Sequence, residues 1–370
     1  MADTAKPSVL VLGGTGFIGR NFVHHLVVND LASYIRVADK VLPQTAYMDE
    51  AHAASFASPI VEFRQANLTN DASIEKAFTD GVETPFRFVI NLAGETKYSQ
   101  PETVYAEKIA QLTTKVATAA AKHGVERFVE VSTAQVYDGN KKTKSEDEKL
   151  KPWTNIATHK VQAEEALAGI DGLNYVVVRP AIVYGPGDVA GIAPRIICGA
   201  VYKQLGEKME FLWTKDLAIN TVHVDDVVRA LWHLTSHGES GEVFNLADKG
   251  NTNQGKVNEI LEAIFGIDTK FAGKIKSNLA RVNLSGVTET VNEKHLKPWS
   301  DLCKAAGIEN TPLTPYLDQE LLYNNHLCID GSKIEGTGFT YEVPEINEEL
   351  VRAQIAYHVS QGIFPESSLQ

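Results

Sequence analysis

Three glycines spaced three residues apart could bind a phosphate group. Gly13, Gly16 and Gly19 follow directly on the apolar run 9–12, in the stretch VLVLGGTGFIG. In a strand–turn–helix unit, the first glycine permits a tight turn, the second lets the backbone approach a pyrophosphate, and the third lets the helix pack on the strand. The helix start offers free N–H groups and a positive dipole end. The predicted phosphate-binding residues are Gly13, Thr15, Gly16, Phe17, Ile18 and Gly19.

An acidic residue extends this prediction from a phosphate to a dinucleotide. Asp39 stands twenty residues after Gly19, at the end of the next apolar run, 34–38. A carboxylate there accepts hydrogen bonds from a ribose 2′-hydroxyl and repels a 2′-phosphate, which favours NAD over NADP. Each signal has a plainer alternative, because glycine turns also join strands to helices without a ligand and an aspartate commonly caps a turn or a helix. Because the strand, the glycine turn, the helix start and Asp39 all stand at the spacing of a dinucleotide-binding unit, the sequence favours NAD binding over these alternatives.

Other clusters of reactive side chains predict neither a metal site nor a hydrolase. His233 and His237 are four residues apart, but no carboxylate or cysteine nearby completes a ligand set. Asp225 precedes an apolar-periodic stretch and is interpreted as a helix N-cap rather than as part of a catalytic cluster. No GxSxG turn is present to carry a serine nucleophile.

The elements that would position these residues follow a strand–helix rhythm. Short apolar runs alternate with longer helical stretches, the clearest of which, 104–123, stops at Gly124 as at a C-terminal cap. This alternation predicts an α/β protein built on a Rossmann-type, doubly wound parallel sheet with helices on both faces. The predicted strands are 9–12, 34–38, 60–63, 86–90, 127–131 and 175–178.

The rhythm loosens in the second half of the chain. Residues 1–188 are therefore predicted to form the NAD-binding domain, and residues 189–370 mainly a smaller C-terminal substrate lobe. Some segments of that half, about 215–250, are expected to return to the first domain. Segment 268–326 shows neither a clear period nor a motif. The charged stretch 141–151 is expected to be an exposed loop or lid.

Composition and charge narrow the classes of function. The 370 residues are 44% apolar and 22% charged, as in an ordinary soluble protein with a substantial core. A formal net charge of −12 disfavours a nucleic acid and a membrane surface as partners. The three cysteines are widely spaced and form no CxxC pair, which indicates a reducing compartment. No apolar run approaches the ~20 residues of a membrane span, and no leader is expected, so we expect a cytoplasmic protein.

Several motifs, in the right order, resemble the extended short-chain dehydrogenase/reductase superfamily of NAD-dependent epimerases, dehydratases and reductases. Together they cover roughly residues 8–250, and the tail around 330–339 is a weaker match. The resemblance implies a small-molecule substrate held between the two lobes. It also implies a homodimer that pairs through the helices 104–123 and 156–168. The matching pieces are 13–19, NLAG at 91–94, VSTAQVY at 131–137, Lys160, RPAIVYGPG at 179–187 and TVHVDDV at 221–227.

The resemblance also assigns roles to individual residues. Thr133 matches a hydroxyl residue that positions the substrate oxygen, and Lys160 matches a lysine that bonds the nicotinamide ribose. That lysine normally lowers the pKa of a tyrosine one helical turn earlier. The further cofactor contacts that the resemblance implies are Asn67 and Leu68 beside the adenine, Ala93 and Gly94 along the ribose, and Pro180.

The match breaks at the position of the tyrosine. Residue 156 is isoleucine, which has no proton to exchange. Tyr98 and Tyr137 are the nearest replacements that strand-end geometry permits, so with Thr133 and Lys160 they complete the predicted catalytic set.

The sequence leaves two hypotheses for the function. One is an NAD-dependent oxidoreductase, epimerase or dehydratase acting on a hydroxyl or carbonyl of a nucleotide sugar or sterol-like molecule. The other is a catalytically lapsed relative that keeps NAD as a regulator or assembly subunit.

Overall fold

The computed structural model describes residues 6–369. Its centre is a seven-stranded sheet in the order β10-β6-β5-β4-β1-β2-β3, with every neighbouring pair parallel. The order reverses between β1 and β4, which is where an open sheet of this kind leaves a crevice for a ligand. The Rossmann-type prediction is confirmed. The strands are β1 (Ser8–Leu12), β2 (Tyr34–Asp39), β3 (Val61–Gln65), β4 (Phe88–Asn91), β5 (Arg127–Val131), β6 (Tyr175–Pro180) and β10 (Val243–Leu246).

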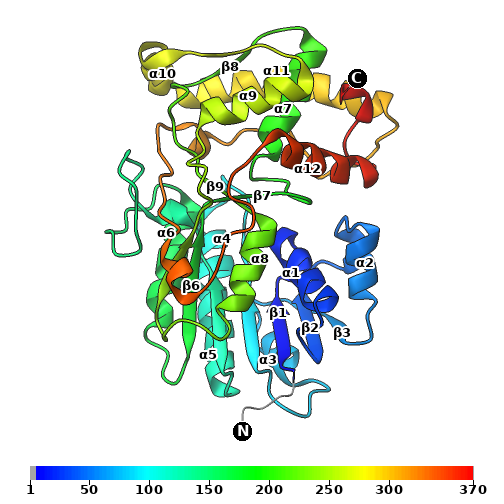
Figure 1. Cartoon of the computed structure of the whole chain (residues 1–370), viewed down its shortest axis with the longest axis vertical. Coiled ribbons are helices and arrows are strands. Elements are labelled where there is room, and N and C mark those ends of the chain that lie inside the picture. The colour runs from blue at the N-terminus through cyan, green and yellow to red at the C-terminus, as the bar shows by residue number, and fades with distance from the viewer. Residues whose placement is uncertain (1–5, 370) are drawn as a thin grey trace.

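Helices cover both faces of this sheet (Figure 1). Alternate side chains of a strand point to opposite faces, so Val9 and Val11 join one core with α1 and α8, while Leu10 and Leu12 join another with α3 and α5. Both faces are apolar, as a fully covered parallel sheet requires. These helices are α1 (Phe17–Val28), α2 (Glu50–Phe56), α3 (Asp71–Thr79), α4 (Glu102–Tyr105), α5 (Leu112–Lys122), α6 (Asn155–Leu167) and α8 (Val224–His233).

The predicted helix 104–123 is helical throughout but not uniform. Between α4 and α5 lies a π-helical segment, Ala106–Gln111. The helical run ends as expected, with Gly124 in the left-handed region at φ +67°. A π segment adds a residue to a turn and is common beside functional sites. This one precedes α5 on the side of the sheet where β4 ends.

The rest of the chain forms a second group of helices with its own core (Figure 1). Segment 268–326, where the sequence showed no period, contains the longest helix, α11, which has 22 residues and carries Pro298 inside it. Its buried side chains recur at helical spacing, but Thr288, Asn292 and His295 among them are polar, which explains the missing apolar period. These elements are α7 (Ala193–Leu205), α9 (Gln254–Phe265), α10 (Gly273–Val282), α11 (Leu284–Ala305), α12 (Glu348–Ser360), and the short strands β7 (Ile182–Tyr184), β8 (Met209–Phe211), β9 (Thr221–His223) and β11 (Thr269–Phe271).

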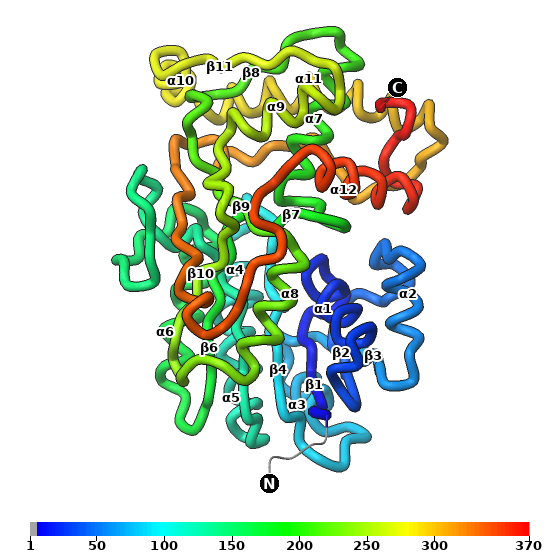
Figure 2. Tube along the Cα trace, viewed as in Figure 1, coloured from blue at the N-terminus to red at the C-terminus, as the bar shows by residue number. Residues whose placement is uncertain are grey.

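The C-terminal half contributes to the sheet as well as to the second core. Segment 215–250 contains β9, α8 and β10, and β10 pairs with β6. A later segment also returns to the sheet before α12 begins (Figure 2), where Ile334 and Phe339 join the core of β1 and α8. The division of the chain at residue 188 stays a prediction. Short 3-10 helices are η1 (Pro43–Thr45), η3 (Ala134–Val136), η4 (Gln319–Leu322), η5 (Lys333–Thr337) and η6 (Glu366–Leu369).

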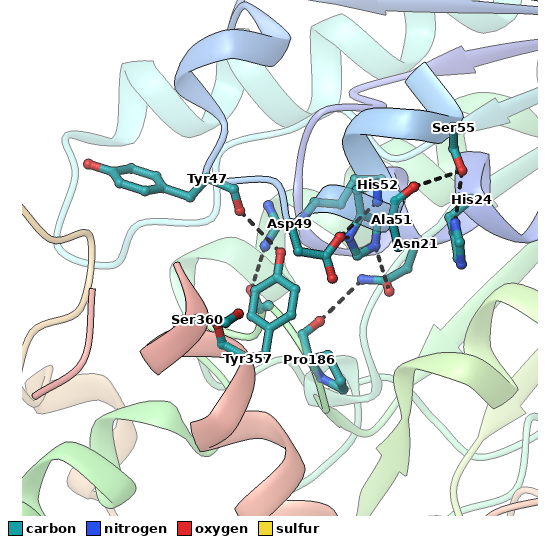
Figure 3. A network of polar contacts seen from close by, with 12 residues as sticks. Asn21, His24, Tyr47, Asp49, Ala51, His52, Ser55, Pro186, Tyr357 and Ser360 are labelled. Carbon is teal, nitrogen blue, oxygen red and sulfur yellow. Dashed lines mark hydrogen bonds and ion pairs between the residues drawn. The ribbon is translucent and has the colours of Figure 1, made fainter. Parts of the chain in front are cut away.

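Polar contacts join α1, α2 and α12 (Figure 3). Arg20 of α1 donates from Nη2 to Gly187 O at 2.8 Å, and Asn21 donates to Pro186 O at 3.4 Å. Tyr357 of α12 donates its hydroxyl to Tyr47 O at 3.1 Å. Burial without a carboxylate partner lowers the pKa of Arg20. These directional bonds hold α1 to the loop before α7, and α12 to the loop before α2.

The stretch 141–151 is tied down rather than free. Lys144 is buried, and its backbone N–H donates to Cys328 O at 2.9 Å. Glu146 accepts the backbone N–H of Asn245 at 2.7 Å, and so covers part of the outer edge of β10. The expected exposed loop is therefore anchored along the sheet edge, where it protects a strand from pairing with another chain.

Asp248, just after β10, is expected to make stability depend on pH. Its carboxylate accepts from Thr221 Oγ1 at 2.7 Å and from the Gly250 N–H, yet burial raises its pKa to about 6. Because the unfolded pKa is about 4, the folded state binds the extra proton between these values. The contribution of Asp248 to stability is therefore greatest below about pH 4 and falls by up to about 3 kcal/mol as pH rises through 6. Asp248→Asn should gain stability relative to the natural protein as pH rises, measured by urea unfolding at both ends of this range. A constant difference would contradict the assignment.

Candidate functional site

The three glycines of the turn play different structural roles. A Cβ on Gly13, which has φ +75°, would lie 2.7 Å from Ala93 N, and one on Gly19 would lie 2.5 Å from Gly13 O. Both glycines are therefore required by the packing of β1, α1 and the end of β4. A Cβ on Gly16 would meet only Gly13 O, at 3.3 Å. Gly16 thus faces open space, where a ligand could approach the backbone.

The first turn of α1 leaves donors free for an anion. Gly16 is its N-cap and supplies no side-chain cap. The N–H groups of the first helical turn, which include those of Phe17 and Ile18, have no partner within a helix. The side chains of Phe17 and Ile18 instead pack against the core of β1. This geometry fits a pyrophosphate and needs no cationic side chain.

Asp39 holds the loops around the turn. At the end of β2 its carboxylate accepts the N–H of Thr15 at 3.1 Å and of Val41 at 3.0 Å. The turn-capping role that the sequence left open is thus present. A carboxylate has about four acceptor positions, so these two bonds leave room for ribose hydroxyls. The ribose contact itself stays a prediction.

At the end of β3, Asn67 and Leu68 are placed differently from each other. Asn67 is exposed, and its Oδ1 accepts from the N–H and the hydroxyl of Thr69 at 3.1 and 3.0 Å. Leu68 is buried with Ala93 in the core between the sheet and the helices α3 and α5. The adenine contact predicted for this pair stays a prediction.

Lys160 on α6 points to the end of β5 and is paired there with a buried carboxylate. Its Nζ donates to Glu130 Oε1 at 2.9 Å and to Val131 O at 2.5 Å, and it lies 4.0 Å from where a Cβ on Gly94 would stand. The position by Gly94 puts the ammonium group beside the strand end along which a cofactor ribose is predicted to run. Because its ammonium group forms this ion pair, Lys160 is not simply a lysine whose stem packs against the protein and whose ammonium group reaches water.

Sequence reasoning did not single out Glu130. It is fully buried in β5 and also accepts from Asn91 Nδ2 at 2.6 Å and from Thr113 Oγ1 at 3.3 Å. Burial raises the pKa of its carboxyl group. Such a group is costly unless it is paired and hydrogen-bonded. The available signal was a glutamate inside the apolar strand 127–131, with an amide at Asn91 on the neighbouring strand.

Thr133 and Tyr98 meet through Gln135, a second residue that sequence reasoning missed. Thr133 caps η3 by accepting the Gln135 N–H at 3.2 Å. The side-chain amide of Gln135 lies 3.2 Å from the Tyr98 hydroxyl, and it accepts from Thr154 Oγ1 at 3.0 Å. Burial raises the pKa of Tyr98 to about 12. Its phenol is thus neutral at ordinary pH and can donate a hydrogen bond.

Tyr137 lies in a buried hydrogen-bonded contact, and its role as an alternative proton donor stays a prediction. It is 1% exposed, its hydroxyl donates to Asn245 Oδ1 at 2.8 Å, and it accepts from Arg179 Nη1 at 2.7 Å. Arg179 in turn pairs with buried Glu164. Both hydrogen-bonding positions of the hydroxyl are occupied, so Tyr137 belongs to the packing between β6 and β10. The neighbouring Pro180 is buried at the end of β6 and pairs with Leu246.

Part of the C-terminal half lies against this site. Ser99 donates its hydroxyl to Asp318 Oδ2 at 2.6 Å, and Asn155, at the start of α6, donates its N–H to Glu320 Oε2 at 3.0 Å. Trp213 donates its indole N–H to Leu322 O at 2.9 Å. The segment around η4 therefore lies against the residue next to Tyr98 and the start of α6, and brings two carboxylates there.

The remaining clusters have structural roles. His223, not Asp225, caps α8, by accepting the Asp225 N–H at 3.3 Å. His233 and His237 stack with ring centroids 3.8 Å apart, and His237 bonds back to His233 O. Within residues 6–369, no group of three or more His, Cys, Asp or Glu side chains is placed to hold a metal ion. No helix of this part of the chain is both long enough and apolar enough to cross a membrane.

Comparison with known proteins places the chain in a family. The model of the NAD dependent epimerase/dehydratase family matches residues 9–247. A sterol-4-alpha-carboxylate 3-dehydrogenase (decarboxylating) of Candida albicans is 25% identical over 93% of this chain and 98% of its own length. A 3 beta-hydroxysteroid dehydrogenase/Delta 5-->4-isomerase of Mycobacterium tuberculosis is 31% identical, over about half of each chain (49% and 48%).

Solved structures agree on the fold. The dTDP-glucose 4,6-dehydratase of Streptomyces venezuelae, crystallised with NAD, superposes with a TM-score of 0.70 over 98% of this chain and 99% of its own, at 18% identity. The predicted cofactor, NAD, is also the one named in the family's description. The glycine turn, the order of the sheet and the match over residues 9–247 lead to one conclusion: the chain belongs to the NAD dependent epimerase/dehydratase family.

Proposed function

We propose that the protein is an NAD-dependent enzyme that acts on a hydroxyl or carbonyl group of a small molecule. The observation that carries this proposal is the cluster of Tyr98, Gln135 and Thr133 at the strand ends. It offers a neutral phenol and a hydroxyl to one substrate oxygen, although residue 156 is isoleucine. When bound, NAD supplies the acceptor or donor of the hydride.

The chain's own residues would divide the remaining work. Thr133 orients the substrate oxygen, and Tyr98 exchanges the proton with it. Lys160, fixed by Glu130, presents its ammonium group beside Gly94 and bonds the cofactor ribose. The fit to NAD is supported by the free first-turn N–H groups of α1, the open side of Gly16 and the Asp39 carboxylate.

We favour an apolar, sterol-like substrate, which carries no diphosphate, over a nucleotide sugar. Asp318 contacts Ser99, next to Tyr98, and Glu320 contacts the start of α6, and carboxylates there would repel a diphosphate. The Candida albicans relative, which acts on a sterol carboxylate by its name, matches over almost its whole length. Turnover of a panel of sterols, hydroxy-ketones and nucleotide sugars tests this choice. It is followed by NADH absorbance and by product analysis, because an epimerase or dehydratase returns its hydride to the substrate and leaves no net NADH. Activity confined to nucleotide sugars would reverse it.

The second candidate is a catalytically lapsed protein that binds NAD as a regulator or assembly subunit. Ile156 favours it, because the family's proton-exchanging tyrosine is missing there. It predicts NAD binding with no turnover on any member of the same panel.

NAD(H) is expected to bind more tightly than NADP(H). A 2′-phosphate carries up to ~2 negative charges and would meet the Asp39 carboxylate, so the preference should be at least about fivefold, or about 1 kcal/mol. Calorimetric titration with both cofactors measures it. Asp39→Asn keeps an acceptor for the Thr15 N–H and removes the charge, so it should narrow the preference. Equal or tighter NADP(H) binding by the natural protein would remove Asp39 from this role.

We further propose a homodimer that pairs through the predicted helices 104–123 and 156–168. In the fold, α4, the π segment and α5 pack beside α6, so the two helices form one continuous surface. Thr118 and Gln162, one from each helix, are exposed on it. Light scattering at micromolar concentration should give twice the chain mass of 40.5 kDa. A species of the chain mass alone would count against the dimer.

A further inference from the structure

Helix α10, at the outer end of the C-terminal half, turns an apolar stripe toward solvent. Ile275, Leu279 and Val282 are 83%, 70% and 88% exposed. At about 100° per residue they lie within about 60° of one another around the helix axis. Single exposed apolar side chains are ordinary on a protein surface. Three of them on one face of one helix form a patch with no partner among residues 6–369, and such patches mark binding surfaces.

Contacts on the opposite face fix this orientation. Ser277, about 140–160° around the helix from the three apolar residues, is fully buried, and its Oγ accepts the Trp213 N–H at 2.6 Å. The Gly273 N–H donates to Trp213 O at 2.9 Å. Figures 1 and 2 show α10 at the edge of the molecule farthest from the sheet. The helix is therefore held by its polar side, with its apolar side outward.

Basic side chains flank the stripe on both sides. Lys276 lies about 100° to one side of Ile275, and Lys274 lies about 100° to the other side, with Arg281 close to it. Helix α10 contains these three basic residues and no acidic one, in a chain whose net charge is −12. Lys276 pairs with Glu210. Lys274 and Arg281 make no ion pair with any residue that the structure describes, so their charges are available to a partner.

We propose that α10 docks the protein on an anionic lipid surface. An apolar face bordered by Lys and Arg is the pattern of a helix that lies in the headgroup region, where the basic side chains meet lipid phosphates. At about 15 Å, the helix is half the length needed to span a bilayer. This local charge pattern overrides the expectation, drawn from net charge, that no membrane is a partner.

Two other occupants fit less well. Three side chains offer far less than the ~800 Å² per partner of a stable protein interface. A second copy of the chain placed stripe to stripe would bring Lys274, Lys276 and Arg281 against their own equivalents, and like charges oppose such a contact. A lipid surface needs neither a large area nor a complementary shape.

The position of α10 links this surface to the candidate site. Trp213, which contacts Ser277 of α10, also donates to Leu322 O in the segment around η4. Trp213 therefore connects the docking helix to the segment that contacts the residue next to Tyr98, which suits an apolar substrate that partitions into lipid. This link rests on the proposed function, whereas docking itself does not, so failure of either leaves the other testable.

Co-sedimentation with vesicles tests the docking. We expect the full chain to sediment with vesicles of equal parts phosphatidylcholine and phosphatidylserine, weakly with phosphatidylcholine alone, and less as salt increases. Ile275→Ser with Leu279→Ser should lower the partition coefficient at least about tenfold. Leu296→Ser is the matched control, because Leu296 is 50% exposed on α11. Lys274→Glu with Arg281→Glu should also weaken binding, whereas Lys304→Glu on α11 should not.

Three results would overturn the proposal. One is no sedimentation of the natural protein with the anionic vesicles. Another is an equal loss of vesicle binding in the Leu296→Ser control, or no loss of vesicle binding in the α10 variants. The third is a dimer, seen by light scattering, that Ile275→Ser with Leu279→Ser dissociates while vesicle binding is absent, which would assign the stripe to a second copy of the chain. Circular dichroism confirms folding of each variant, which is expected because the substituted side chains are exposed.

Discussion

Gly16→Val is expected to give a folded protein that no longer binds NAD(H). The valine side chain would fill the open side of the turn, through which the backbone reaches a pyrophosphate. The loss of two charge-assisted hydrogen bonds, worth about 1.5–3 kcal/mol each, corresponds to at least a hundredfold loss of affinity. Titration calorimetry with NAD+ and with NADH measures this change.

The fold should tolerate this substitution. The Gly16 backbone is extended, at φ −65° and ψ 176°, which a β-branched residue adopts without strain. Its Cβ would meet only one atom, at 3.3 Å, so a small shift accommodates it. Thermal unfolding of the variant should therefore be cooperative and close to that of the natural protein.

Gly19→Ala provides the contrasting control. A Cβ there would lie 2.5 Å from both Gly13 O and Gly14 Cα, which are backbone atoms that cannot move without separating α1 from β1. This variant should lose stability first, and affinity only as a consequence. Normal NAD(H) binding by Gly16→Val would make the turn purely structural and would remove the basis for the cofactor site.

The sheet and the turn could be predicted from sequence because their signals are local. Each strand is a short apolar run, and residues 9–19 hold the strand, the turn glycines and the helix start within one window. The six predicted strands correspond to β1–β6, with ends that differ by up to two residues. The seventh, β10, was anticipated only as a segment that returns to the first domain.

The polar contacts of the site could not be predicted, because they join residues distant in sequence. Ser99 meets Asp318, and Asn155 meets Glu320, across 219 and 165 residues. The periodicity of the sequence is local and cannot indicate such distant contacts. The contacts of Tyr137 are equally non-local, because its hydroxyl bonds to Arg179 and Asn245 on two other strands.

Tyr98→Phe is the second change with a large expected effect, because it tests whether the protein is an enzyme. A positioned acid or base contributes about 10² to 10⁴ in rate, so turnover should fall by that factor while NAD affinity stays nearly unchanged. The phenyl ring fills the same space, and the Gln135 amide keeps its bond from Thr154. Steady-state rates on any substrate found in the panel, together with NAD titration, separate the two effects.

Tyr137→Phe is the matched control, since both changes remove one phenolic hydroxyl. Here the loss leaves Arg179 Nη1 and Asn245 Oδ1 without their partner in a buried place. The expected cost is about 1–3 kcal/mol of unfolding free energy, with turnover preserved below the unfolding temperature. A large loss of turnover in Tyr137→Phe, with none in Tyr98→Phe, would reverse this assignment.

Ile156→Tyr decides between the two proposed functions. Residue 156 lies one turn before Lys160 on α6 and is only partly buried, so a tyrosine there has room for its hydroxyl. If the protein is catalytically lapsed, the natural chain should bind NAD without turnover, and this variant should gain weak activity, because Thr133 and Lys160 still stand where a tyrosine needs them. If the protein is an enzyme that uses Tyr98, the natural chain should already turn over, and the new phenol should add little. Rapid turnover that survives both Tyr98→Phe and Tyr137→Phe would exclude either tyrosine as the proton donor, and rapid turnover of any kind would exclude the lapsed function.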